Sequence, residues 1–154
     1  MAQEPMKILF VCTGNTCRSA MAAAMMLDIA VKNDLNILID SAGVFAGIGE
    51  GATDEAIEAM KKRDIDLTYH RTKPLTDELI GMADVILTMT GAHKELLEHY
   101  APEKVKTLLE YAGGEGDISD PYGGDLEEYE ETAAQIYDAL VDIAEKLPVI
   151  EDQP

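Results

Sequence analysis

The sequence lacks several features that would assign it to a class at once. Its 154 residues include two cysteines and no tryptophan. No apolar run approaches the roughly 18 residues that a membrane-spanning helix needs. The start shows neither the apolar stretch nor the small-residue cleavage site of a signal peptide. We therefore expect a cytoplasmic protein with no membrane partner.

Cationic residues are also scarce. Lys and Arg number 12 against 30 Asp and Glu, which gives a formal net charge of −18 at pH 7. Such a chain repels a phosphate backbone unless one face is locally basic, so we expect no nucleic-acid partner. The segment 107–145 has no Lys or Arg, and we interpret most of it as a solvated acidic face. The hydrophobic content of 47% is nevertheless enough for a core.

The pattern of apolar runs predicts one domain over residues 1–154, with loose ends at 1–6 and 149–154. Short apolar runs predict four strands, at 7–11, 37–40, 84–89 and 105–109. Capping residues and helix-forming segments predict helices at 19–33, 53–63, 76–82, 90–100 and 126–147. This alternation predicts an α/β fold in three layers, a four-stranded parallel sheet with helices on both faces. Ligands bind such sheets at the carboxyl ends of the strands.

The loop after the first predicted strand carries the strongest functional signal. Cys12 is followed six residues later by Arg18, with a strand before the loop and a helix after it. Backbone N–H groups in such a loop can surround a tetrahedral oxyanion, and Gly14 permits the turn. Arg18 can hold two phosphate oxygens, and the same positive surroundings favour the thiolate of Cys12. Ser19 can donate a hydrogen bond to the sulfur. The plainer alternative is a buried Cys and a surface Arg that share a turn.

Attack on phosphorus also requires an acid for the leaving group. Asp120 is the best candidate, because its loop follows the fourth predicted strand and so lies at the edge that carries Cys12. Pro121 stiffens that loop. Asp-Pro pairs also start turns, so the residues alone leave the acid and the turn as open alternatives.

The chain resembles the low-molecular-weight protein tyrosine phosphatases along nearly its whole length. The matching segments are VCTGNTCRS at 11–19, SAG at 41–43, ADVIL at 83–87 and DPY at 120–122. The resemblance implies the family's flavodoxin-like fold with a four-stranded parallel sheet. It also implies that Cys12 forms a cysteinyl-phosphate while Asp120 protonates the leaving group and then activates water. No metal or cofactor is implied.

The same resemblance assigns the remaining site residues. Arg18 and the loop amides would stabilise the phosphate oxygens in both steps. In the family Asn15 ties the loop into its shape, with Ser41 as the expected partner. The phosphate-binding loop as a whole consists of Thr13, Gly14, Asn15, Thr16, Cys17 and Ser19.

Several positions depart from the tyrosine-specific pattern. Thr16 stands where those enzymes have Ile, Ala20 where they have Pro, and Gly123 where a second Tyr is common. The aromatic residue after the SAG segment is not a Trp, because the chain has none. These departures point away from a standard phosphotyrosine enzyme.

The departing segments resemble the bacterial protein-arginine phosphatase branch of the family. The similar segments are Thr16, SAGVF at 41–45, TMT at 88–90 with His93 and Lys94, and DPYGG at 120–124. In that branch the Thr is linked to phosphoarginine selection. A Thr hydroxyl offers a polar contact to guanidinium, whereas a phosphotyrosine ring prefers an apolar wall. The sequence thus favours phosphoarginine over phosphotyrosine, with Thr16, Phe45 and Tyr122 as selectivity residues.

Other interpretations remain beside this one. Cys17 can form a reversible disulfide with Cys12 that shields the nucleophile, or be a small buried side chain. Arsenate reductases of this fold use further downstream cysteines, and none follows Cys17. A module that binds phosphate without turnover needs neither Cys12 nor Asp120. We therefore expect a monomeric enzyme that acts on phosphorylated proteins.

Overall fold

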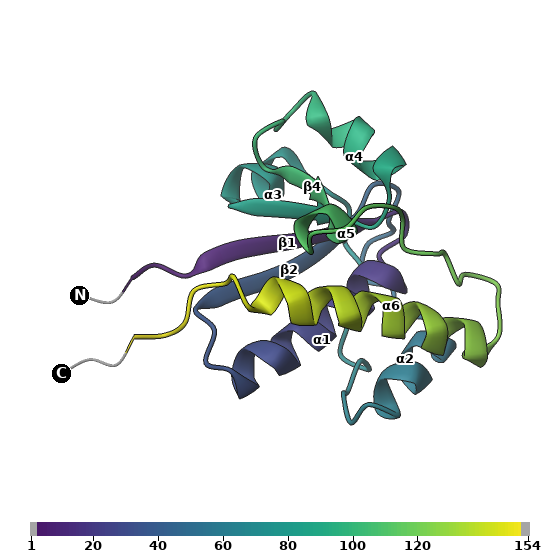
Figure 1. Ribbon diagram of the computed structural model, residues 1–154. Helices are drawn as coiled ribbons and strands as arrows, with labels where there is room; N and C mark the ends of the chain where they lie inside the picture. Colours follow the sequence, from purple (N-terminus) through teal and green to yellow (C-terminus); the bar gives the residue numbers. More distant parts are fainter. Residues whose placement is uncertain (1–2, 152–154) are drawn as a thin grey trace.

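The structure is a computed structural model that describes residues 3–151 (Figure 1). Its sheet has the order β2-β1-β3-β4, and every pairing is parallel. The strands are β1 (Met6–Cys12), β2 (Ile37–Gly43), β3 (Val85–Thr88) and β4 (Val105–Thr107). The helices are α1 (Arg18–Lys32), α2 (Asp54–Lys61), α3 (Asp77–Met82), α4 (Gly91–Glu98), α5 (Leu108–Tyr111) and α6 (Leu126–Ala144).

Helices cover both faces of the sheet, which confirms the predicted three-layer α/β fold. In Figure 1, α1, α2 and α6 lie below the sheet and α3 and α4 lie above it. Successive side chains of β1 point to opposite faces, so this one strand contributes to two cores. Ile8 and Phe10 pack into the core between the sheet and helices α1 and α6, while Leu9 and Val11 pack with Leu97 on the other face.

The fourth strand is shorter than the sequence predicts. A strand over 105–109 was expected, but β4 ends at Thr107 and α5 begins at the next residue. The Oγ1 atom of Thr107 accepts the Glu110 N–H at 3.1 Å, and the Glu110 carboxylate accepts the Thr107 N–H at 3.0 Å. This reciprocal capping box starts a helix where the two leucines between these residues indicated strand.

Both predicted loose ends are partly held in place. Met6 already belongs to β1, and Val149 forms an antiparallel bridge with Leu35. The Ile150 N–H also donates to the Asp34 carbonyl at 2.7 Å. The expected loose segments 1–6 and 149–154 are therefore wrong at these positions, while residues 1–2 and 152–154 lie outside the described part. No helix within residues 3–151 is long and apolar enough to cross a membrane.

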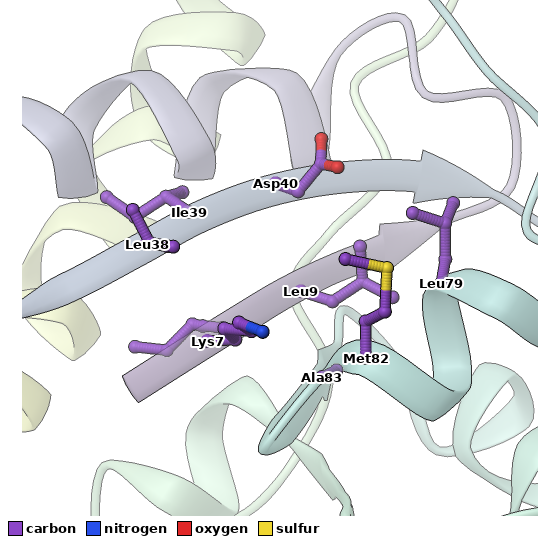
Figure 2. A pocket seen from close by; sticks show the side chains of 9 residues that line it. Lys7, Leu9, Leu38, Ile39, Asp40, Leu79, Met82 and Ala83 are labelled. Carbon is purple, nitrogen blue, oxygen red and sulfur yellow. The ribbon is translucent and has the colours of Figure 1, made fainter. Parts of the chain in front are cut away.

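An apolar cavity of about 310 Å³ lies beside α3, near the amino end of β1. Figure 2 shows Leu79 and Met82 rising from α3 near Leu9 of β1, with Leu38 on β2. Its charged lining consists of Lys7 and Asp40. This cavity lies away from the carboxyl end of β1, and no Cys, Ser or Thr lines it.

Candidate active site

A second cavity, of about 300 Å³, lies at the carboxyl end of β1. Cys12 is the last residue of β1 and Arg18 is the first of α1, so the loop between them joins strand to helix. β1 pairs with β2 on one side and β3 on the other, which is the switch point where such sheets bind ligands. The residues lining this cavity are Cys12, Thr13, Gly14, Thr16, Cys17, Arg18, Phe45, Gly47, Glu50, Asp120 and Tyr122.

The backbone of the loop is arranged to bind an anion. The carbonyls of Cys12 and Thr13 accept the N–H groups of Val44 and Phe45, at 3.0 and 2.9 Å. In the described chain, the backbone N–H groups of residues 13–17 donate no hydrogen bond to another backbone group. Cys17, the N-cap of α1, gives no side-chain cap to the helix start. The loop thus presents unpaired donors together with the positive end of the helix dipole.

Arg18 adds a charged donor to this loop. Its side chain is buried, and its Nη1 donates to the Ile118 carbonyl at 3.0 Å. Its Nη2 lies 3.6 Å from Oδ2 of Asp120. Its buried Nε has no hydrogen-bond partner among the described residues. A buried guanidinium with a free N–H beside uncapped amides fits a phosphate oxyanion.

A buried cluster of polar side chains is hydrogen-bonded within and next to the loop. Sγ of Cys12 lies 2.9 Å from Oγ of Ser19. The side-chain amide of Asn15 donates to Ser19 at 2.8 Å and to Ser41 at 3.0 Å. Asn15 is fully buried and has a φ of +58°, in the left-handed region that Asn tolerates better than most residues. The structure thus joins Asn15 and Ser41, as the resemblance implied, beneath the cavity.

Residues 70–73 bind the other polar groups of Asn15. The Asn15 carbonyl lies 2.7 Å from Nε2 of His70, and its Oδ1 accepts the Lys73 N–H at 3.1 Å. Burial lowers the pKa of His70, so the neutral ring is favoured at pH 7. Sequence reasoning missed this contact because 55 positions separate the two residues.

His93 supports the loop from the opposite side. Its Nε2 lies 2.8 Å from Oγ1 of Thr13, and its Nδ1 lies 3.0 Å from Oγ1 of Thr90. Burial, followed by the positive charge of Arg18, lowers the pKa of His93. A neutral ring that donates from Nε2 and accepts at Nδ1 satisfies both hydroxyls. The sequence showed His93 only as part of a resembling segment and gave no sign of this contact.

Gly43 permits the close approach of β2 to the loop. A Cβ atom built there would lie 2.5 Å from the Thr13 carbonyl oxygen and 2.9 Å from the Asn15 nitrogen. Only a residue without a side chain fits at this position. The SAG segment at 41–43 therefore contributes a polar partner through Ser41 and a steric requirement through Gly43.

Cys17 is a buried free thiol next to the nucleophile position. Burial, followed by repulsion from Cys12, raises the pKa of Cys17 to about 11. Cys17 is therefore a protonated thiol at neutral pH. Within residues 3–151, no cluster of His, Cys, Asp and Glu is arranged to hold a metal ion.

The mouth of the cavity is formed by exposed aromatic side chains. Phe45 is 84% exposed and Tyr122 is 71% exposed, on two different loops. The N–H of Tyr122 donates to Oδ1 of Asp120 at 3.1 Å, which orients the carboxylate in its loop. The predicted selectivity residues Thr16, Phe45 and Tyr122 thus line one cavity with Asp120.

Comparison with known proteins agrees with this geometry. Residues 7–150 match the family model described as low molecular weight phosphotyrosine protein phosphatase. The chain therefore belongs to the low-molecular-weight phosphotyrosine protein phosphatase family.

Individual relatives bear two kinds of name. The chain is 43% identical over 146 residues to a protein-arginine-phosphatase of Bacillus subtilis, covering 92% of this chain and 97% of that one. It is 40% identical over 139 residues to the low-molecular-weight protein-tyrosine-phosphatase PtpB of Staphylococcus epidermidis, covering 89% and 95%. Its fold matches a YwlE arginine phosphatase variant with a phosphorylated active-site serine, at a TM-score of 0.88, 42% identity, and 92% and 95% coverage.

Proposed function

We propose that the protein is a cysteine-dependent protein phosphatase that hydrolyses phosphoarginine in proteins. The observation that supports this proposal most is one cavity shared by Cys12, the unpaired loop amides, Arg18 and Asp120. A binding module has no need of a thiol and a carboxylate at the same phosphate site. A single chain carries every group of the reaction, so we propose that the monomer is active.

In the first step, the thiolate of Cys12 attacks phosphorus and the P–N bond breaks. The bonding electron pair passes to the guanidine nitrogen, and Asp120 donates a proton to it, so that arginine leaves as a guanidinium. Arg18 and the loop amides stabilise the equatorial oxygens of the transferring group.

In the second step, Asp120 removes a proton from a water molecule that attacks the cysteinyl-phosphate. The S–P bond breaks, inorganic phosphate leaves, and the electron pair returns to Sγ of Cys12. The hydroxyl of Ser19, 2.9 Å away, stabilises the departing thiolate. Two free thiols in this site suit a reducing compartment, which supports a cytoplasmic location.

Phosphotyrosine is the alternative substrate, because relatives of both names match the chain. Thr16 lines the cavity and supports phosphoarginine, since its hydroxyl can contact a guanidinium and leaves less apolar wall for a ring. Phe45 and Tyr122 can flank either side chain at the mouth.

The test is kcat/KM on two matched peptides, one with phosphoarginine and one with phosphotyrosine, with Cys12→Ser as the blank. We expect preference for phosphoarginine, and Thr16→Ile should shift the preference toward phosphotyrosine. Preference of the wild type for phosphotyrosine would overturn the substrate assignment. Absence of turnover on both peptides would overturn the enzyme itself.

A further inference from the structure

Glu50 is a second carboxylate in the lining of the catalytic cavity, and the reaction above gives it no role. It lies in the loop between β2 and α2, which also contributes Phe45 and Gly47 to the lining. In the part of the chain that the structure describes, no basic side chain pairs with Glu50, whereas Asp120 lies near Arg18.

The backbone of Glu50 is held firmly by a buried residue. Its N–H donates to Oγ1 of Thr72 at 3.0 Å, and its carbonyl accepts the Thr72 N–H at 2.8 Å. The same Thr72 hydroxyl donates to the Gly47 carbonyl at 2.8 Å, and Thr72 is 2% exposed. Thr72 thus fixes Glu50 and Gly47 relative to each other at the cavity wall.

Gly47 leaves the space in which the Glu50 carboxylate lies. A Cβ atom at position 47 would stand 2.9 Å from Cδ of Glu50 and 3.0 Å from each carboxylate oxygen. Such contacts are closer than side chains normally allow. The carboxylate therefore lies directly against Gly47, in the wall of the cavity that contains Cys12.

A carboxylate at this place repels a substrate whose only charge is its phosphate. Phosphotyrosine is such a substrate, because its ring is neutral. The guanidinium of phosphoarginine is a cation with several N–H donors, and it matches a carboxylate in charge and geometry. We propose that Glu50 is a specificity-determining residue that binds the guanidinium of phosphoarginine. This inference rests on the proposed function.

The test measures kcat/KM of three variants on phosphoarginine and phosphotyrosine peptides with neutral flanking residues. Glu50→Gln removes the charge and keeps the shape, while Gly47→Ala displaces the carboxylate and keeps the charge. Glu145→Gln, at an exposed position beyond α6, removes one charge elsewhere as the matched control.

Both cavity variants should lower kcat/KM on phosphoarginine by roughly twofold to fivefold, the range for an exposed charge pair. Turnover of phosphotyrosine should stay constant or rise, which also shows that each variant is folded. Glu145→Gln should match the wild type on both peptides.

If Glu50→Gln lowers kcat/KM equally on both peptides, or lowers it on neither, the inference is overturned. A third peptide carries phosphotyrosine beside a lysine. It tests whether Glu50 binds a cationic residue next to the phosphorylated side chain and not the guanidinium of phosphoarginine. A loss confined to that peptide would show that Glu50 binds flanking residues instead, and would also overturn the inference. A wild type with no phosphoarginine turnover above the Cys12→Ser blank would instead refute the proposed function.

Discussion

The Oγ atom of Ser19 lies 2.9 Å from the Sγ atom of Cys12. The side-chain amide of Asn15 donates to the same Oγ, which leaves the hydroxyl hydrogen of Ser19 free to point at sulfur. A hydroxyl aimed in this way stabilises the thiolate both as nucleophile and as leaving group.

Ser19→Ala should therefore slow the reaction mainly at its second step. A hydrogen bond to a charged group contributes about 1.5–3 kcal/mol, so kcat should fall roughly 10- to 100-fold. Rapid-quench kinetics should then show an accumulated cysteinyl-phosphate. Ser41→Ala is the control, because Ser41 contacts Asn15 and not Cys12. An equal accumulation in both variants would contradict the role given to Ser19.

Asn15→Ala should destabilise the fold as well as the loop. It leaves buried partners of the amide unpaired and places Ala at a φ of +58°. We expect a loss of about 3–4 kcal/mol in unfolding free energy, measured by denaturant titration. Asn15→Gly should lose about 1 kcal/mol less, because Gly adopts that φ without strain. Equal losses would show that the backbone conformation contributes nothing.

Gly43→Ala should displace the phosphate-binding loop. The new Cβ would overlap the Thr13 carbonyl oxygen, at 2.5 Å, and a shift of about 1 Å in such a loop lowers the rate roughly 100-fold. The measurement is kcat/KM on an aryl phosphate. Gly51→Ala is the control, since a Cβ there would meet nothing within 4 Å. Full activity of Gly43→Ala would contradict the close approach of β2.

His93 should make the fold less stable in acid. Burial holds the pKa of His93 below its ordinary value of 6.5 in the folded state. Below pH 6.5 the unfolded chain then binds more protons than the folded one, so the free energy of unfolding falls as pH falls. The melting temperature of the wild type should fall between pH 7.5 and pH 5.5, and that of His93→Gln should fall less. His99→Gln, at an exposed His, should retain it.

The two cysteines should react differently with iodoacetamide. The pKa of Cys17 is raised to about 11, so Cys17 is a thiol throughout the neutral range. At pH 7.5 we expect alkylation of Cys12 before Cys17, identified by peptide mass spectrometry, because only thiolates react well. Denatured protein should be labelled at both. Faster labelling of Cys17 in the folded protein would contradict the assigned environment.

Sequence patterns predicted the sheet and the order of its elements because the apolar runs and caps are local. They missed α5, although Thr107 and Glu110 have the spacing of a capping box, because the leucines between them favoured a strand. They also could not reveal the supports of the loop. His70, His93 and Gly43 meet residues 12–15 only after folding, and Glu50 reaches the cavity through its contacts with Thr72.

Asn36 joins the two ends of the described chain, because its carbonyl accepts the Met6 N–H at 3.0 Å and its N–H donates to the Pro148 carbonyl at 2.7 Å. Figure 1 shows both ends on the same side of the molecule. Ends this close suit circular permutation. A circular permutant would join these ends by a short linker and have its new termini in the exposed loop at Gly113 and Gly116. The strand–loop–helix unit around Cys12 would stay uncut.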